Sequence, residues 1–263
     1  MDIAGQVVVI TGGGSGIGAA LAQRFAADGA RAVVVADLRA EAAHEVAAQI
    51  GGTAEAQAVD VADAAAVGAL VEQVLARHGR IDLFCANAGM TTGVGIDDDD
   101  AWHRAFEVNT MSQVYSARAV LPSMLARGRG YLLHTASAAG LLTSPGDAPY
   151  AVTKHGAVAF AEWLAVTYGD EGIGVSVLCP LGVATPLLMD PLSGGNAAAQ
   201  VVAASGEIIT PEQVADAVIA GLAEERFLIL PHRQVGTFWA QKAADPDRWL
   251  AGVRRLTHRD DIG

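Results

Sequence analysis

The chain alternates short runs of β-branched residues with alanine-rich segments over nearly its whole length. Apolar runs such as Val7–Ile10 and Val33–Ala36 are each followed by a longer stretch in which apolar residues recur at helical spacing. Strands that are apolar throughout are typical of parallel sheets, whose crossover helices cover both faces. The alternation therefore predicts an α/β fold with a doubly wound sheet of about seven parallel strands flanked by helices.

Composition limits the classes of function. With 52% hydrophobic and 17% charged residues, the chain of 263 residues is typical of a globular protein, and we expect residues 1–263 to form one domain. A formal net charge of −12 argues against a nucleic-acid-binding surface, which needs a basic patch. No apolar run approaches the ~18 residues that span a bilayer, and no basic leader precedes the first strand. We therefore expect a cytoplasmic protein with neither a nucleic-acid nor a membrane partner.

The sequence offers no pattern typical of a metal site. Cys85 and Cys179 each end an apolar run, and we expect buried thiols in a reducing compartment. The seven histidines show no paired ligand spacing. The run Asp97–Asp100 precedes a predicted helix, where carboxylates cap backbone N–H groups.

The stretch from Thr11 to Gly18 places five glycines directly after the first apolar run. A strand that ends in glycines and opens into a helix presents backbone N–H groups to an anion. Gly12 permits a tight turn, Gly16 permits close approach of a pyrophosphate, and Gly18 lets the helix pack against the sheet. Asp37 ends the second predicted strand 19 residues after Gly18, where a carboxylate would bind an adenosine ribose and repel a 2′-phosphate.

These features favour NAD over NADP as cofactor. Ser15, rather than a basic residue, stands before Gly16, and Arg39 is the one nearby cation that could offset the charge of Asp37.

The spacing T-G-x-x-x-G-x-G, carried by Thr11 to Gly18, resembles the loop of the short-chain dehydrogenase/reductase family. Ala86–Gly89 resembles the family's N-N-A-G motif with its first Asn replaced, and Tyr150 and Lys154 match its Y-x-x-x-K motif. The resemblance extends over nearly the whole chain and implies a Rossmann-like fold. It implies that cofactor contacts come from Gly12, Ser15, Gly16, Ile17, Gly18, Asp37, Asp60, Val61, Asn87, Gly89, Tyr150, Lys154, Pro180, Val183 and Thr185.

The resemblance also implies a catalytic set of Asn109, Ser137, Tyr150 and Lys154. Tyr150 would exchange a proton with the substrate oxygen, Lys154 would hold the nicotinamide ribose, Ser137 would orient the substrate, and Asn109 would hold a water of the proton relay. Tyr150 and Lys154 are four residues apart and share a helix face. We expect the ammonium and an oxidised nicotinamide to lower the pKa of the phenol.

One position departs from the family pattern. Leu181 stands where the family has glycine in P-G-x-V-x-T, whereas Pro180, Val183 and Thr185 match. Either the turn is ordinary there, or the loop is reshaped and Leu181 points toward the substrate.

The segment at about residues 185–206 is the least regular, and we expect a mobile substrate loop or lid. It contains no Lys or Arg, so we expect a fairly apolar secondary alcohol or ketone as substrate rather than an anion. The candidate lining consists of Met90, Ser137, Leu141, Leu142, Leu187, Leu188 and Met189.

The sequence leaves two other functions open. One is a non-catalytic dinucleotide-sensing protein on the same fold, which loss of the Ser–Tyr–Lys set would have favoured. The other is an epimerase or dehydratase, whose substrate domain is usually longer than the segment after Thr185 here. By resemblance we expect a homotetramer or homodimer that pairs the helices starting near Ala101 and Tyr150.

Overall fold

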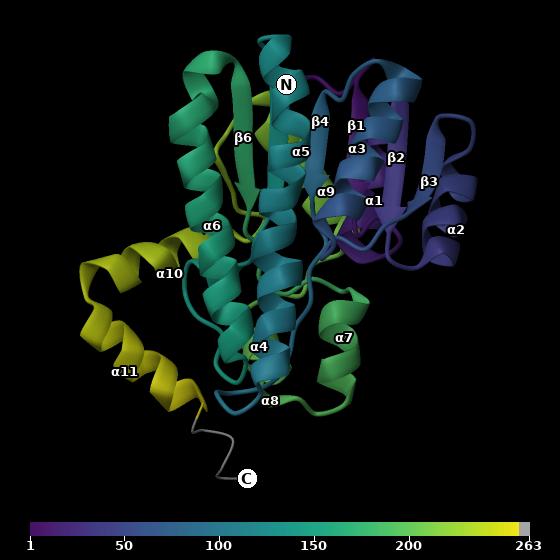
Figure 1. Ribbon diagram of the computed structural model, residues 1–263. Coiled ribbons are helices and arrows are strands. Elements are labelled where there is room, and N and C mark those ends of the chain that lie inside the picture. Colours follow the sequence, from purple (N-terminus) through teal and green to yellow (C-terminus); the bar gives the residue numbers. More distant parts are fainter. Residues whose placement is uncertain (258–263) are drawn as a thin grey trace.

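The computed structural model describes residues 1–257 of the chain, and residues 258–263, which include His258 and end the predicted domain, lie outside the described part. Seven parallel strands form one sheet in the order β3-β2-β1-β4-β5-β6-β7 (Figure 1). The prediction of a doubly wound, Rossmann-like sheet of seven parallel strands is confirmed. The strands are β1 (Val7–Thr11), β2 (Ala32–Asp37), β3 (Ala54–Ala58), β4 (Leu83–Ala86), β5 (Gly130–Thr135), β6 (Ile173–Leu178) and β7 (Leu228–Ile229).

Helices cover both faces of the sheet. The helices are α1 (Gly16–Ala27), α2 (Ala40–Ile50), α3 (Ala64–His78), α4 (Asp99–Phe106), α5 (Ser112–Ala126), α6 (Ala148–Tyr168), α7 (Pro186–Ser193), α8 (Ala197–Ala204), α9 (Pro211–Ala223), α10 (Arg233–Ala244) and α11 (Pro246–Thr257).

The core consists of two apolar clusters on opposite faces of the sheet. Along β1, Val7 and Val9 belong to the cluster under α3, α5 and α6, whereas Val8 and Ile10 belong to the cluster under α1, α2 and α9. Successive side chains of a strand point to opposite faces, and all four valine and isoleucine side chains are fully buried. This explains why the strands read as uninterrupted apolar runs.

The helix expected to start near Ala101 is interrupted. Helix α4 begins at Asp99, a π-helical turn covers Glu107–Met111, and α5 continues from Ser112. Asp98 accepts a hydrogen bond from the N–H of Ala101, so the acidic run does cap the helix. A π-helical turn inserts one residue and rotates the side chains within it, and Asn109 lies in this turn.

The segment expected to be an irregular lid contains two helices, α7 and α8. Its alanine and leucine residues favour helix, and Gly194 and Gly195 separate the two. The last strand, β7, is only two residues long and pairs with β6 at the edge of the sheet.

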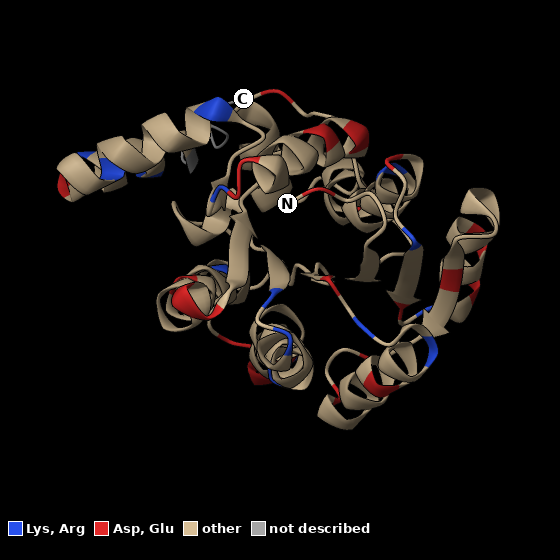
Figure 2. Ribbon diagram, turned by 90° about the horizontal axis from the view of Figure 1, so that it is seen from above, with Lys and Arg blue, Asp and Glu red and all other residues tan. Residues whose placement is uncertain are grey.

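Helices α10 and α11 project from one side of the body (Figure 1). In α11, Arg248 lies near the start of the helix, and Arg254 and Arg255 lie near its end. Over the rest of the molecule, acidic and basic residues are interspersed (Figure 2). No helix within residues 1–257 is long and apolar enough to cross a membrane.

Candidate active site

The glycine loop after β1 needs its glycines for steric reasons. Gly12 has a φ of +63°, and a Cβ there would lie 2.9 Å from the Cα of Ala88. Gly18 lies in the first turn of α1, and a Cβ on this residue would collide with the carbonyl oxygen of Gly12 in the preceding loop. Gly16, at φ +51°, would press a Cβ within 2.9 Å of Thr185 Cγ2. The loop therefore exists in this form only with glycine at these positions.

The N-terminus of α1 presents donors that a dinucleotide phosphate could accept. Ser15 is the N-cap residue, yet its side chain makes no capping hydrogen bond. The first intrahelical bond runs from the N–H of Ala19 to the carbonyl of Ser15, so the N–H groups of Gly16, Ile17 and Gly18 precede it. This cradle fits a pyrophosphate, which would accept those N–H groups.

Asp37 stands at the end of β2 beside the glycine loop. Its carboxylate accepts the N–H of Gly14 at 2.9 Å and the N–H of Arg39 at 3.0 Å, and it is 8% exposed. The Arg39 guanidinium is 4.0 Å away and largely exposed. The carboxylate is thus fixed in place, and water screens the one cation near it.

Three further predicted cofactor residues, Asn87, Asp60 and Val61, follow the carboxyl ends of strands β4 and β3. Asn87 donates through Nδ2 to the carbonyls of Thr11 (3.1 Å) and Gly12 (3.3 Å), and its Oδ1 accepts from Thr135 (3.1 Å). Asn87 thereby joins the ends of β1, β4 and β5. After β3, Val61 is buried and Asp60 is exposed.

Asn109 holds the loop that follows β4. Its Oδ1 accepts the N–H of Met90 at 2.8 Å, and its Nδ2 donates to the carbonyl of Met90 at 2.9 Å and to Thr153 Oγ1 at 3.1 Å. A Cβ on Gly89 would lie 3.3 Å from Asn109 Oδ1 and 3.1 Å from Lys154 Nζ, so this residue must also be small. The amide braces the loop against α6, and its expected role in a water relay stays a prediction.

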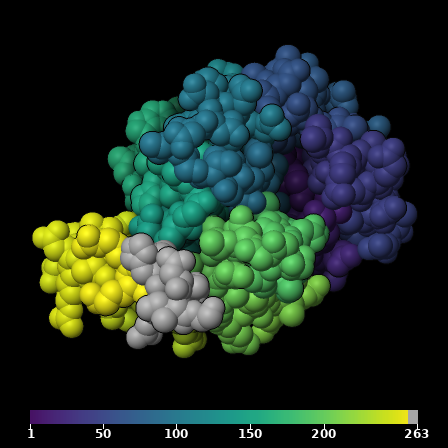
Figure 3. Space-filling model, turned by 90° about the horizontal axis from the view of Figure 1, so that it is seen from below, coloured from purple at the N-terminus to yellow at the C-terminus, as the bar shows by residue number. Residues whose placement is uncertain are grey.

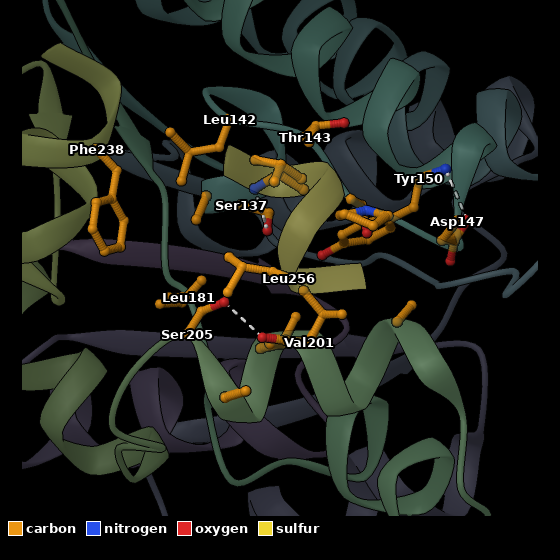
Figure 4. Close-up of a pocket in the computed structure, with 18 of the residues that line it drawn as sticks. Ser137, Leu142, Thr143, Asp147, Tyr150, Leu181, Val201, Ser205, Phe238 and Leu256 are labelled. Atoms are coloured by element: carbon orange, nitrogen blue, oxygen red, sulfur yellow. Dashed lines mark hydrogen bonds between the residues drawn. The ribbon is translucent and has the colours of Figure 1, made fainter. Parts of the chain in front are cut away.

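Ser137, Tyr150 and Lys154 come together at the carboxyl end of β5, and Figure 4 shows the side chains of Ser137 and Tyr150. Ser137 follows β5 directly, whereas Tyr150 and Lys154 lie on the first two turns of α6. Lys154 Nζ donates to the carbonyl of Thr135 at 3.1 Å and lies 5.6 Å from the centroid of the Tyr150 ring. The structure therefore assembles the predicted catalytic side chains around one point.

Burial dominates the electrostatics of this group. It raises the pKa of Tyr150 to about 12, although the hydrogen bond with the Ser137 side chain opposes the shift. Burial also lowers the pKa of Lys154 to about 8. In the protein alone, desolvation of the phenolate raises the pKa of the phenol, and the lowering expected with an oxidised nicotinamide bound stays a prediction.

Asp147 is a further member of the site, which the motifs in the sequence did not indicate. It is 2% exposed, and its carboxylate accepts the N–H and hydroxyl of Thr92 (2.8 and 2.6 Å), the N–H of Gly93 (2.9 Å) and the N–H of Tyr150 (3.1 Å). It caps α6 and ties the loop after β4 to that helix. An acid directly before the A-P-Y start of a helix is the sequence signal that would have indicated it.

The loop with the unusual Leu181 has ordinary backbone geometry. Within residues 1–257, Glu225 is the non-glycine residue with positive φ, so Leu181 is not strained. The N–H of Leu181 donates to Nδ1 of buried His232 at 3.1 Å, and His232 Nε2 lies 3.1 Å from the carbonyl of Gly182. An imidazole from the start of α10 thus supports this turn, and the Leu181 side chain lines the cavity.

A cavity of about 990 Å³ opens beside Ser137 and Tyr150. The helices α7 and α8 (green) and the C-terminal helices (yellow) flank this face of the molecule (Figure 3). Of the predicted lining, Ser137, Leu142, Leu187 and Leu188 border the cavity, whereas Met90, Leu141 and Met189 do not.

The C-terminal helices contribute a wall of the cavity that the sequence pattern did not indicate. Phe238 of α10 and Trp249, Val253 and Leu256 of α11 border the cavity, together with Arg248 and Arg255. The segment 185–206 contains no Lys or Arg, as expected from the sequence. The cavity wall nevertheless includes two cations, Arg248 and Arg255.

Comparison with known proteins adds independent information. A family model described as short chain dehydrogenase matches residues 6–193. A 1-deoxy-11-beta-hydroxypentalenate dehydrogenase of Streptomyces avermitilis is 35% identical over 98% of this chain and 96% of its own length. A D-threitol dehydrogenase of Mycolicibacterium smegmatis is 34% identical over 82% of this chain and 85% of its own. The crystal structure of a short chain dehydrogenase/reductase from Burkholderia phymatum in complex with NAD superposes with a TM-score of 0.86, at 28% identity, over 94% of this chain and 96% of that one.

Proposed function

The chain belongs to the short-chain dehydrogenase/reductase family, and we propose that it is an NAD-dependent oxidoreductase that interconverts a fairly apolar secondary alcohol and the corresponding ketone. The observation that carries the proposal is the convergence of Ser137, Tyr150 and Lys154 between the glycine-loop cradle and a large, mostly apolar cavity, with Ser137 and Lys154 buried and Tyr150 half-buried. A substrate oxygen beside Tyr150 would have the cofactor cradle on one side and apolar walls on the other.

The proposed preference for NAD rests on Asp37. Its carboxylate is held by two backbone N–H groups at the end of β2, where the adenosine ribose of a dinucleotide lies in this fold. A ribose hydroxyl can donate to that carboxylate, whereas a 2′-phosphate would meet its charge. The structural relative with bound NAD is consistent with this cofactor.

We assign the proton chemistry to Tyr150. NAD supplies the hydride acceptor when it is bound. The phenol lies beside the Ser137 hydroxyl, so both groups can hydrogen-bond one substrate oxygen, and Tyr150 can take or return its proton. Lys154 is fixed by the carbonyl of Thr135 one helical turn away, where its charge favours the phenolate and its ammonium can reach a ribose hydroxyl.

The proposed substrate class rests on the cavity walls. Leu142, Leu181, Leu188, Phe238 and Val253 all line the cavity, so a hydrocarbon body would be desolvated by apolar walls. Each buried CH₂ would contribute about 0.8 kcal/mol to binding. The two curated relatives act, by their names, on a hydroxypentalenate and on a threitol, which differ in polarity. The substrate class proposed for this chain therefore rests on its own cavity walls.

We also propose a homo-oligomer, dimeric or tetrameric, that pairs the faces of α4 to α6. Trp163 and Val166 on α6 are 54% and 87% exposed, and Phe106 on α4 is 40% exposed. Exposed apolar groups of this size are typical of an association surface.

The test of the proposed function is NADH formation with a series of 2-alkanols, cyclohexanol, sugar alcohols and short hydroxy acids. We expect kcat/KM to rise with alkanol length and to exceed that of the sugar alcohols. Binding of NAD without turnover of any alcohol or ketone would instead favour a non-catalytic dinucleotide-binding protein. A flat response along the alkanols, with a sugar alcohol as the best substrate, would overturn the apolar class.

A further inference from the structure

Helix α11 forms the wall of the cavity that the lid segment does not supply. Trp249, Val253 and Leu256 recur at helical spacing and border the cavity from this helix. Figure 4 shows Leu256 among the lining side chains, between Leu181 and Tyr150 in this view. The apolar stripe of α11 thus faces the space in which the substrate would bind.

The same helix brings hydrogen-bond donors without acceptors to this wall. Arg248 and Arg255 border the cavity, and their guanidinium groups form no ion pair or hydrogen bond with any residue within 1–257. The indole N–H of Trp249 is buried and, within the same described residues, has no acceptor. Seven residues of helix separate the two arginines, which places them about 10 Å apart along the axis.

The carboxylates on the cavity wall do not satisfy these donors. Asp147 is saturated by four hydrogen bonds from Thr92, Gly93 and Tyr150. Asp245 is exposed, and it accepts the backbone N–H of Arg248 rather than a guanidinium. Arg255 lies ten residues after Asp245, which corresponds to about 15 Å along the helix axis.

We propose that α11 binds a carboxylate on the substrate, at the end of the molecule remote from the reacting hydroxyl. This inference rests on the proposed function and narrows its substrate class to an apolar hydroxy acid, or the matching keto acid. A guanidinium presents its N–H groups in a plane that matches a carboxylate, and Arg248 and Arg255, which are exposed to solvent, border the cavity beside the apolar stripe. The hydrocarbon body would lie along Trp249 and Val253 while the hydroxyl meets Ser137 and Tyr150.

The test compares three matched substrates at each chain length from six to twelve carbons: the hydroxy acid with its hydroxyl on the penultimate carbon, its methyl ester, and the 2-alkanol. The measured quantity is the ratio of kcat/KM for acid and ester, with NAD. We expect a ratio of about three to ten in favour of the acid once the chain is long enough to reach α11, the size of a partly screened ion pair. Shorter acids gain no such advantage.

Variants locate the effect. In the double variant Arg248→Gln/Arg255→Gln the ratio should fall to about one, and in Arg255→Glu it should fall below one. Arg254→Gln is the matched control, because it removes the same charge from the same helix at a position that does not border the cavity. The control should keep the wild-type ratio.

A ratio near one at every length in the wild type, or a ratio that survives the double variant, would overturn the inference. Calorimetric binding of the saturated carboxylates and their methyl esters to NADH-loaded protein gives a readout without turnover. If no alcohol is oxidised, the proposed function fails, and tighter binding of the carboxylate that depends on Arg248 and Arg255 still decides the assignment of α11. Equal binding of acid and ester would refute it.

Discussion

The carboxylate of Asp147 accepts the backbone N–H of Tyr150 at 3.1 Å, so a buried acid stands at the start of the helix that carries the reactive phenol. The same carboxylate accepts three donors from Thr92 and Gly93. Its charge is one of the causes that raise the pKa of Tyr150. Asp147 therefore fixes the geometry of the site at a cost to the acidity of the phenol.

Replacing Asp147 by Asn should change both properties. Loss of the negative charge favours the phenolate, so the pKa of Tyr150 falls and the rising limb of the pH profile for alcohol oxidation moves to lower pH. The amide NH₂ also faces the N–H groups of Thr92 and Gly93, which should cost about 2–4 kcal/mol of stability. The measurements are kcat against pH and the melting temperature.

Asp98→Asn is the matched control, because Asp98 caps α4 through the N–H of Ala101 in an exposed position and Asn is an equally good cap. A pH profile of Asp147→Asn that coincides with the wild type would contradict the electrostatic role.

Asp37→Ala should reduce cofactor discrimination. The variant removes the charge that a 2′-phosphate would meet and the acceptor for a ribose hydroxyl, so the ratio of kcat/KM for NAD and NADP should fall at least tenfold, equivalent to about 1.4 kcal/mol. Glu41→Ala, an exposed acid in the first turn of α2, is the control for net charge. A wild-type enzyme that prefers NADP would show that Asp37 does not select the cofactor.

Lys154→Met should stabilise the cofactor-free protein while it abolishes activity. The pKa of Lys154 is lowered from 10.5 to about 8 by burial, so the unfolded chain binds the proton more tightly than the folded protein does. The free energy of unfolding is therefore reduced by the full cost of burying the ammonium below pH 8. Removing the buried charge at pH 7 should gain about 1–3 kcal/mol, since the carbonyl of Thr135 keeps its bond from Gln113 Nε2. Thermal unfolding at pH 7 measures this, and a lower melting temperature would contradict it.

His134 should make the protein sensitive to mild acid. Burial lowers its pKa from 6.5 to about 4, so it folds in the neutral form. The free energy of unfolding is therefore unaffected by His134 above pH 6.5. It decreases as the pH falls from 6.5 toward 4, by about 2 kcal/mol at pH 5, because the unfolded chain binds the proton more tightly. Urea unfolding at pH 7 and pH 5 should show a smaller difference in His134→Asn than in the wild type, and equal differences would argue against this cause.

The sequence predicted the parts of the molecule that depend on local pattern. Strand alternation, the glycines around Gly12 and the spacing of Tyr150 and Lys154 follow from periodicity and steric rules, and the structure arranges them as expected. Met90 was expected to line the substrate site, but it does not border the cavity, and its main chain is held by Asn109.

The missed features depend on contacts between segments distant in the sequence. His232 supports the turn at Leu181 from 51 residues away, and no local rule links the two. Helix α11 borders the cavity only because α10 turns the chain back toward the site, so its arginines could not be assigned to the wall from the sequence.

Turnover by Tyr150→Phe tests the central claim most directly. The variant keeps the ring and removes only the hydroxyl, so we predict that folding and the Kd for NAD are retained while kcat falls by about 10²–10⁴-fold. Tyr168→Phe, at the far end of the same helix and outside the cavity, should keep wild-type activity. A folded Tyr150→Phe variant with more than about a tenth of wild-type activity, a loss far below that expected of an acid/base group, would contradict the assignment.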